Sequence, residues 1–104
     1  DYLDKGGKMP GALFAINDYS AIGCVEALQQ HGIEVPGEVS VIGCDDIDIT
    51  EFIMPPLTTI HIPFDIMGRL AVEQLLDIIR NEEKGTIKYL NGNIIIRDSC
   101  YVTK

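Results

Sequence analysis

Two adjacent carboxylates, Asp45 and Asp46, directly follow the apolar segment Val39–Gly43 and are the strongest candidates for chemistry in this sequence. A carboxylate at the end of a buried strand accepts strong hydrogen bonds from a ligand that carries hydroxyl or N–H groups. In a structural alternative, one aspartate caps the following helix and the other is solvated. In a third interpretation the pair holds Mg²⁺ or accepts a phosphoryl group, but no cluster of further acids and lysine is evident. We favour ligand binding for Asp45 and a structural role for Asp46.

A second polar pair, Asn17 and Asp18, follows the apolar segment Ala12–Ile16. The carboxyl ends of parallel strands meet at one edge of a sheet, where open α/β sheets bind their ligands. An amide offers both a donor and an acceptor, which suits a sugar hydroxyl or the edge of a purine. We therefore predict that Asn17 binds ligand beside Asp45 and that Asp18 only caps a helix. For His61, which lies in a later apolar segment, facing this crevice and facing away are both open.

The sequence lacks the signatures of catalysis and of metal binding. Common catalytic and phosphate-binding motifs are absent and no nucleophile is paired with a base, so we expect no enzyme, no catalytic residue and no cofactor. His31 and His61 are far apart and have no cysteine at ligand spacing, so we expect no metal site.

Composition narrows the class of protein further. The net charge is −8 and the eight Lys and Arg residues are scattered, which argues against nucleic-acid binding by this chain itself. Three cysteines without a CxxC spacing indicate reduced thiols in the cytosol. No apolar stretch approaches the roughly 20 residues of a membrane span, so we expect no membrane partner.

The elements that would position these residues follow from the apolar pattern. Ala12–Ile16 is a short, continuously apolar run, typical of a buried parallel strand, and we predict a second strand over the mostly apolar Val39–Gly43. Between them, Tyr19–His31 has helical spacing and is followed by Gly32, a plausible stop. Strand, helix and strand in this order predict a right-handed βαβ unit, so the expected fold class is α/β, a parallel, Rossmann-like three-layer unit.

The second half of the chain continues with alternating elements. We predict a short helix over Ile47–Ile53, capped by Asp46 or Asp48, a strand over Leu57–Ile62 and a long helix over Phe64–Asn81. Asn91-Gly92-Asn93 is a hairpin signal between Ile87–Leu90 and Ile94–Arg97, and the alternative is a loop between two strands that do not pair.

Several segments together resemble the lactose/galactose-repressor (LacI/GalR) family of bacterial transcription regulators. The resemblance runs from about Leu13 to Cys100 in order and with near-ungapped spacing. It rests on Leu13–Asp18 with Ala21-Ile22-Gly23, Val35–Asp46, Pro55–Ile60, Pro63-Phe64, Met67-Gly68, Ala71, Leu75-Leu76 and Ile96–Cys100.

The resemblance implies that the chain is the carboxyl-terminal part of an effector-binding domain with a partial periplasmic-binding-protein type I fold. Residues 1–57 and 86–104 would form the core of the carboxyl-terminal subdomain, whereas 58–85 would supply a crossover strand and a helix to the other subdomain. A sugar or nucleobase effector would bind between the subdomains and shift the operator affinity of a helix-turn-helix headpiece absent from this chain.

Family positions also carry over to particular residues. Asn17 and Asp45 match the effector contacts, with His61 as a further candidate. A homodimer interface is implied on the helix Tyr19–Gln30 and the stretch Thr50–Pro55, at Ala21, Cys24, Val25, Leu28, Phe52 and Ile53. The chain departs from the family pattern at Cys44, where an aromatic is usual, and at His61-Ile62, where a basic or amide pair is more common.

Two further expectations follow from the resemblance. The alternative function is a periplasmic sugar-binding protein or the receptor domain of a transport system with the same ancestry. Without the rest of the domain, the helix Phe64–Arg80 would lack its native sheet, so we expect its apolar face to fold back onto the chain's own sheet or to pack against a partner chain.

Overall fold

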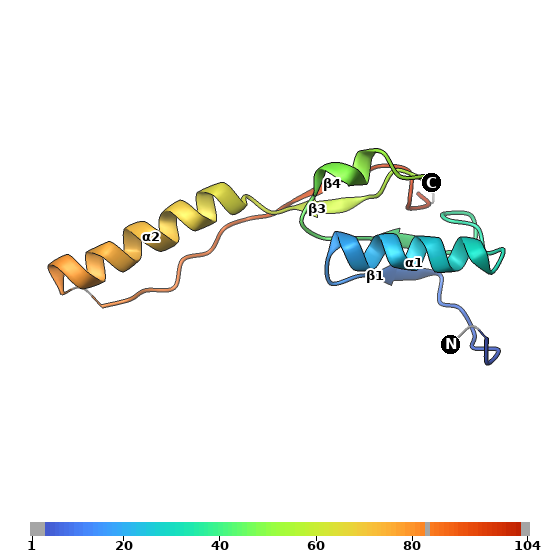
Figure 1. The fold of residues 1–104 in the computed structure, drawn as a ribbon, viewed down its shortest axis with the longest axis horizontal. Helices are drawn as coiled ribbons and strands as arrows, with labels where there is room; N and C mark the ends of the chain where they lie inside the picture. The colour runs from blue at the N-terminus through green and yellow to red at the C-terminus, as the bar shows by residue number, and fades with distance from the viewer. Residues whose placement is uncertain (1–3, 83, 103–104) are drawn as a thin grey trace. The chain divides into compact units, whose positions relative to one another are not determined.

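The computed structural model describes residues 4–82 and 84–102, which form two compact units (Figure 1). The first unit holds the chain up to His61 and again from Asn93 onward, and the second unit is Ile62–Gly92. The elements in chain order are β1 (Ala12–Phe14), α1 (Asp18–Gln30), β2 (Ser40–Ile42), the 3₁₀ helix η1 (Asp48–Glu51), β3 (Thr59–His61), α2 (Phe64–Asn81) and β4 (Asn93–Ile95).

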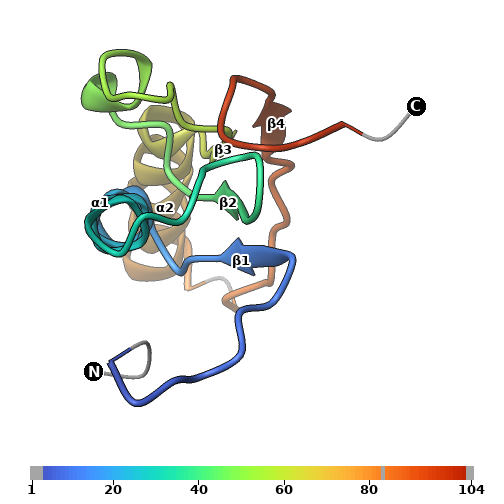
Figure 2. The same ribbon diagram turned by 90° about the vertical axis from the view of Figure 1, so that its right-hand side faces the viewer.

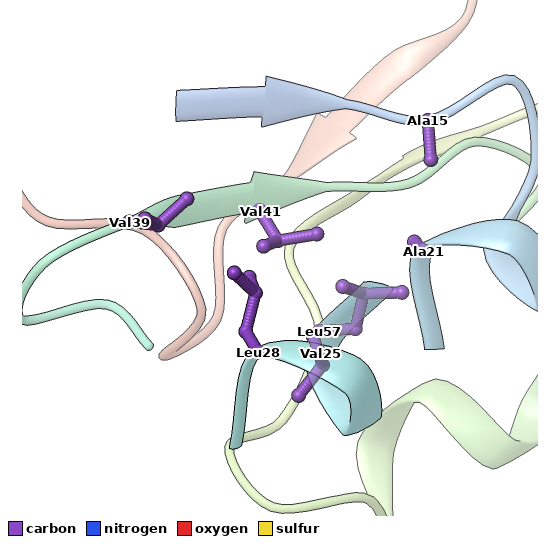
Figure 3. Packing of buried hydrophobic residues seen from close by; sticks show 7 residues of the cluster. All are labelled: Ala15, Ala21, Val25, Leu28, Val39, Val41 and Leu57. Carbon is purple, nitrogen blue, oxygen red and sulfur yellow. The ribbon is translucent and has the colours of Figure 1, made fainter. Parts of the chain in front are cut away.

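The parallel βαβ unit is confirmed. β1 pairs with β2 in parallel, with Leu13 opposite Val41, and α1 connects the two strands (Figure 2). Side chains from α1 and β2 meet between the helix and the strand (Figure 3). The core consists of small and medium apolar residues, namely Ala15, Ala21, Val25, Leu28, Val39, Val41 and Leu57.

The strand Ala12–Ile16 is buried on one face only, which corrects the expectation of a strand buried on both faces. Ala15 is 9% exposed, whereas Phe14 is 67% and Ile16 is 82% exposed. Because successive side chains of a strand point to opposite faces, the helix α1 covers only the face of Ala15. The continuous apolar run therefore leaves an uncovered apolar face on β1 within the described residues.

The strand β3 extends the sheet on the other side of β2. The Gly43 amide donates to the Thr58 carbonyl over 3.0 Å, and the pair Ile42 and Thr58 forms a parallel bridge. β4 then pairs antiparallel with β3, with Thr59 opposite Ile95. The predicted hairpin is therefore wrong, because the partner of β4 is β3 and not Ile87–Leu90. The Asn-Gly signal reflects only the local sequence, whereas β3, with which β4 pairs, lies about thirty residues earlier in the chain.

The second unit is built on α2, whose bounds Phe64–Asn81 match the prediction. Proline precedes its first turn, Asp65 lies in that turn and Arg80 in the last, as the helix dipole favours. None of its 18 residues is buried, and the expected packing of its apolar face against the chain's own sheet or a partner chain stays a prediction. The Gln74 amide donates to the Thr86 carbonyl over 2.5 Å, which ties the following extended segment to the helix.

Candidate ligand-binding edge of the sheet

Three polar residues, Asn17, Asp45 and His61, lie at the carboxyl ends of neighbouring segments of the sheet. The Asp18 amide donates to the Cys44 carbonyl over 2.8 Å, which joins the end of β1 to the end of β2. The Asp45 amide donates to the Ile60 carbonyl over 2.9 Å, and Asp45 forms a parallel bridge with His61. Asn17, Asp45 and His61 therefore belong to three adjacent segments of one sheet edge, where α/β sheets bind ligands.

Asn17 is the N-cap of α1. Its Oδ1 accepts a hydrogen bond from the Ser20 amide over 2.8 Å, and its side chain is half-buried. Sequence reasoning gave the capping role to Asp18 instead, because both residue types are good N-caps. Capping engages Oδ1 of the Asn17 side chain, and the bond from the next residue, Asp18, to the Cys44 carbonyl brings this strand end to that of Asp45.

Asp18 is a buried carboxylate that joins three segments of the chain, which corrects its predicted role. It is fully buried, and its oxygens accept from the Thr59 hydroxyl over 2.5 Å and from the Ile47 amide over 2.8 Å. A Cβ at Gly43 would lie against the Asp18 carboxylate, so only glycine leaves room for this side chain. The signal in the sequence is this glycine, which directly follows Val41 and Ile42 of β2.

The backbone turns sharply at the two aspartates. Asp45 has φ 115° and Asp46 has φ 59°, both in the region that favours glycine. Aspartate enters this region more readily than most residues, and departures of this kind concentrate at functional sites. The turn follows β2, which ends at Ile42, and Asp45 is half-buried.

Asp46 is held by two cationic or polar partners and does not cap η1. Its Oδ1 accepts from the Arg97 guanidinium over 2.9 Å, and its Oδ2 lies 3.0 Å from Nδ1 of His61. Burial raises the pKa of Asp46, but the bonds and charges of Arg97 and His61 outweigh it and lower the pKa overall. η1 instead begins after Ile47 with no side-chain cap, so the predicted caps are wrong.

Arg97 anchors this arrangement to η1 and to the segment that follows it. Its guanidinium donates to the Thr50 hydroxyl over 2.8 Å and to the Leu57 carbonyl over 2.9 Å. Its backbone amide donates to the Thr58 hydroxyl over 2.9 Å. Sequence reasoning missed Arg97, although an arginine that ends an apolar strand of a net acidic chain is a candidate partner for a carboxylate.

The cysteines are free thiols and are half-buried. Burial raises the pKa of the Cys44 thiol, and the nearby charges of Asp45 and Asp18 raise it further. In the part of the chain that the structure describes, no three His, Cys, Asp or Glu side chains gather closely enough to hold a metal ion. Over the same residues, no helix combines the length and the apolar character needed to cross a bilayer.

The residues expected at a dimer interface divide into two groups. Ala21, Val25 and Leu28 are buried in the core of their own chain, at 0%, 3% and 2% exposure, so their side chains cannot reach a partner. This corrects the prediction for these three, whose apolar helical face packs on β2. Phe52 is 75% exposed, and Cys24 and Ile53 are half-buried at the edge of the core.

The surface around Phe52 is continuous with α1. The Gln29 side chain donates to the Met54 carbonyl over 2.8 Å, which fixes the loop after η1 to the helix. Met54 is 77% exposed beside this contact. Exposed apolar side chains grouped in this way are typical of a protein interface.

These features define an α/β domain of the kind that binds small ligands beyond the carboxyl ends of its strands. A family profile described as periplasmic binding protein-like domain matches residues 1–100. The chain therefore belongs to the family of periplasmic binding protein-like domains, and the resemblance to LacI/GalR regulators is confirmed by its relatives.

Two curated relatives are bacterial repressors. The HTH-type transcriptional repressor PurR of Vibrio parahaemolyticus is 44% identical over 100 residues, which cover 95% of this chain and 30% of the relative. The ribose operon repressor of Haemophilus influenzae is 38% identical over 96 residues, which cover 91% of this chain and 29% of the relative. The chain thus spans about 30% of the length of these relatives.

Solved structures agree with this relationship. The lac repressor dimer bound to operator and an anti-inducer has a TM-score of 0.88 at 29% identity, over 97% of this chain and 35% of that one. A sugar-binding transcriptional regulator of the LacI family from Escherichia coli, complexed with phosphate, has a TM-score of 0.76 at 38% identity. This match covers 93% of this chain and 34% of that one.

Proposed function

We propose that this chain is the effector-sensing and dimerising part of a LacI-type transcriptional regulator of the bacterial cytoplasm. A sugar or a nucleobase binds at the sheet edge, and its binding changes the operator affinity of a DNA-binding headpiece elsewhere in the parent protein. The repressor relatives and the lac repressor structures support this function. They do not favour a periplasmic transport protein, and repression requires no catalysis.

The observation that carries the proposal is the line of backbone hydrogen bonds that brings Asn17, Asp45 and His61 to one edge. Asp45 accepts from hydroxyl or N–H groups of the effector, and a charged acceptor strengthens such bonds about twofold. The Asn17 amide adds a donor, and His61 lies next to Asp45. Together these groups suit a polar, neutral ligand with several hydrogen-bonding groups.

The opposing wall of the cleft belongs to the parent protein's other subdomain. Where the sequence predicted 58–85, we assign Ile62–Gly92 to that subdomain and the remainder of the chain to the carboxyl-terminal one, because His61 lies at the same edge as Asp45. The division of the chain into compact units supports this assignment, with limits at His61 and Asn93 rather than at 58 and 85. An effector that contacts both subdomains favours one arrangement of the two. This change of arrangement is what alters the operator affinity of the headpiece.

The surface formed by Phe52, Ile53 and Cys24 makes the homodimer contact in the parent protein. Its exposed apolar side chains and its attachment to α1 through Gln29 support this role. The lac repressor dimer is a solved relative with the same fold.

The test uses the parent protein and its operator, with sugars and purine bases screened by thermal shift and then by operator release. Asp45→Asn is expected to remove the effector response while operator binding persists, because the ligand loses its charged acceptor. Asn17→Ser keeps the helix cap and is expected to weaken the response, since serine caps as well as asparagine but lacks the amide. Asp48→Asn, at an exposed site on η1, is the matched control. A normal response in Asp45→Asn contradicts the site.

A further inference from the structure

The ring of His61 is held through Nδ1 by a carboxylate that is itself fixed. Nδ1 of His61 lies 3.0 Å from Oδ2 of Asp46, and Oδ1 of Asp46 accepts from Arg97 over 2.9 Å. The Asp46 and Arg97 side chains are 19% and 14% exposed, whereas that of His61 is 48% exposed. Asp46 and Arg97 are therefore sheltered from solvent, whereas the ring of His61 is accessible to a ligand.

The chemistry of the contact fixes where the imidazole proton sits. Arginine stays protonated in proteins, and a carboxylate that pairs with it is an acceptor only. The same bonds keep the pKa of Asp46 low, against the effect of burial. The atom of His61 that faces this carboxylate must then be the donor, so Nδ1 carries the proton. In the neutral ring the other nitrogen, Nε2, has no proton and is an acceptor.

We infer that Asp46 sets the tautomer of His61, so that Nε2 of His61 is a hydrogen-bond acceptor at the effector edge and selects ligand groups that donate. This rests on the proposed function, because it assigns a specificity to the same edge. Asp45, paired with His61 across the parallel bridge, is also an acceptor. Two neighbouring acceptors favour sugar hydroxyls or the N–H groups of a base, and disfavour ligands that present only carbonyl oxygens or ring nitrogens.

Arg97 makes Asp46 a positioning residue rather than a second ligand contact. Arg97 is anchored by Thr50 and by the Leu57 carbonyl, and it also lies 3.5 Å from Glu51. With both oxygens engaged, Asp46 has little freedom to turn toward a ligand. A carboxylate that lies behind a histidine and fixes the position of its proton is a general means of orienting imidazole rings.

Nitrogen NMR of the parent protein, labelled at the histidine rings, measures the tautomer without any ligand. The spectrum is recorded near pH 8, above the ordinary His pKa of about 6.5. The signal of His61 is assigned by its loss in His61→Gln. We expect a protonated Nδ1 and an unprotonated Nε2, and in Asp46→Ala a shift of the population toward the Nε2-protonated form. Asp48→Ala is the matched control and leaves the His61 signals unchanged.

The outcomes separate this inference from the proposed function. A wild-type His61 that is mainly Nε2-protonated, or that is an imidazolium at this pH, overturns the inference whatever the edge binds. D-ribose, D-glucose, adenine and guanine are then added as probes. A probe that binds in an Asp45-dependent way is expected to move the Nε2 signal, and binding that leaves it unmoved overturns the selectivity. If none of the four binds, the proposed function and the selectivity both fail, while the tautomer result still decides the role of Asp46.

Discussion

At the scale of single residues, the ligand-binding edge of the sheet depends on the buried carboxylate of Asp18, whose role no local sequence pattern predicts. Asp18 occupies the space left by the missing side chain of Gly43 and bonds to Thr59 and to the Ile47 amide. Each of these groups comes from a different segment, so the edge holds its shape only if all of them are present. An uncompensated buried carboxylate would be costly, and here every oxygen has a partner.

Gly43→Ala tests this arrangement. The new Cβ would meet the Asp18 carboxylate, the Leu57 side chain and Ala21, and overpacking of this kind costs about 1–3 kcal/mol. The free energy of unfolding, measured by urea titration, is expected to fall by that amount. Gly23→Ala is the matched control, because a Cβ there meets nothing within 4 Å and alanine is the better helix former. Equal stability of the two variants would contradict the close packing around Asp18.

Asp46 predicts a particular dependence of stability on pH. Its pKa in the folded protein is lowered, so its stabilising contribution is complete above the ordinary Asp pKa of about 3.9 and is lost as the pH falls through the lowered value. In Asp46→Asn the loss of stability is therefore expected to be largest near neutral pH and to shrink in acid. Urea unfolding of both proteins between pH 7 and 2 measures it, with Asp48→Asn as control. A difference that stays constant over this range would count against the Arg97 and His61 contacts.

At the scale of elements, some parts of the fold follow from local sequence and others do not. The helix α2 is predicted to the residue, because Pro63, the apolar stripe and the terminal charges are all local signals. The strand β4 overlaps the predicted strand Ile94–Arg97 only at Ile94 and Ile95. Its partner is β3, and this pairing depends on contacts distant in sequence. In the same way, the sequence places Asn17, Asp45 and His61 at strand ends, whereas the cap of α1 and the Asp46–Arg97 pair require the assembled sheet.

The exposed apolar face of α2 predicts self-association of the isolated 104-residue chain. Leu75 is 54% and Ile79 is 65% exposed, one helical turn apart. Leu75→Glu with Ile79→Glu is expected to shift the chain toward monomer in size-exclusion chromatography with light scattering. Arg69→Gln with Lys84→Gln adds the same negative charge and keeps the apolar face, so it is expected to associate like the wild type. Equal association of all three proteins would show that this face is not involved.

At the scale of the whole molecule, the chain spans about 30% of the length of its repressor relatives, and under the proposed function its exposed surfaces would contact other parts of a parent protein. The uncovered face with Phe14 and Ile16 and the surface around Phe52 are both apolar and exposed. The relatives are about three times as long as this chain, so the parent has ample further chain to cover one such face. The surface around Phe52 is tied by the bond from Gln29 to the Met54 carbonyl to the helix that resembles a family dimer contact.

Phe52→Glu in the parent protein tests the dimer surface. A buried charge at an apolar contact without a partner is strongly unfavourable, so the dimer is expected to dissociate at least tenfold more readily, equivalent to about 1.4 kcal/mol. Sedimentation equilibrium measures this dissociation. Tyr101→Glu, which also places a charge at an exposed aromatic, is the control. An unchanged dissociation constant in Phe52→Glu would place the partner elsewhere.

The last pair of the β3–β4 ladder, His61 with Asn93, brackets the whole of Ile62–Gly92. In topological terms the second unit is an insertion into a β-hairpin, since the chain leaves the first unit and re-enters it at neighbouring points. Paired residues of an antiparallel ladder have Cα atoms about 4.5–5.5 Å apart, a gap that a two-residue Asn-Gly turn closes. The whole of Ile62–Gly92 therefore stands in the chain at the place where a short turn would otherwise join β3 to β4.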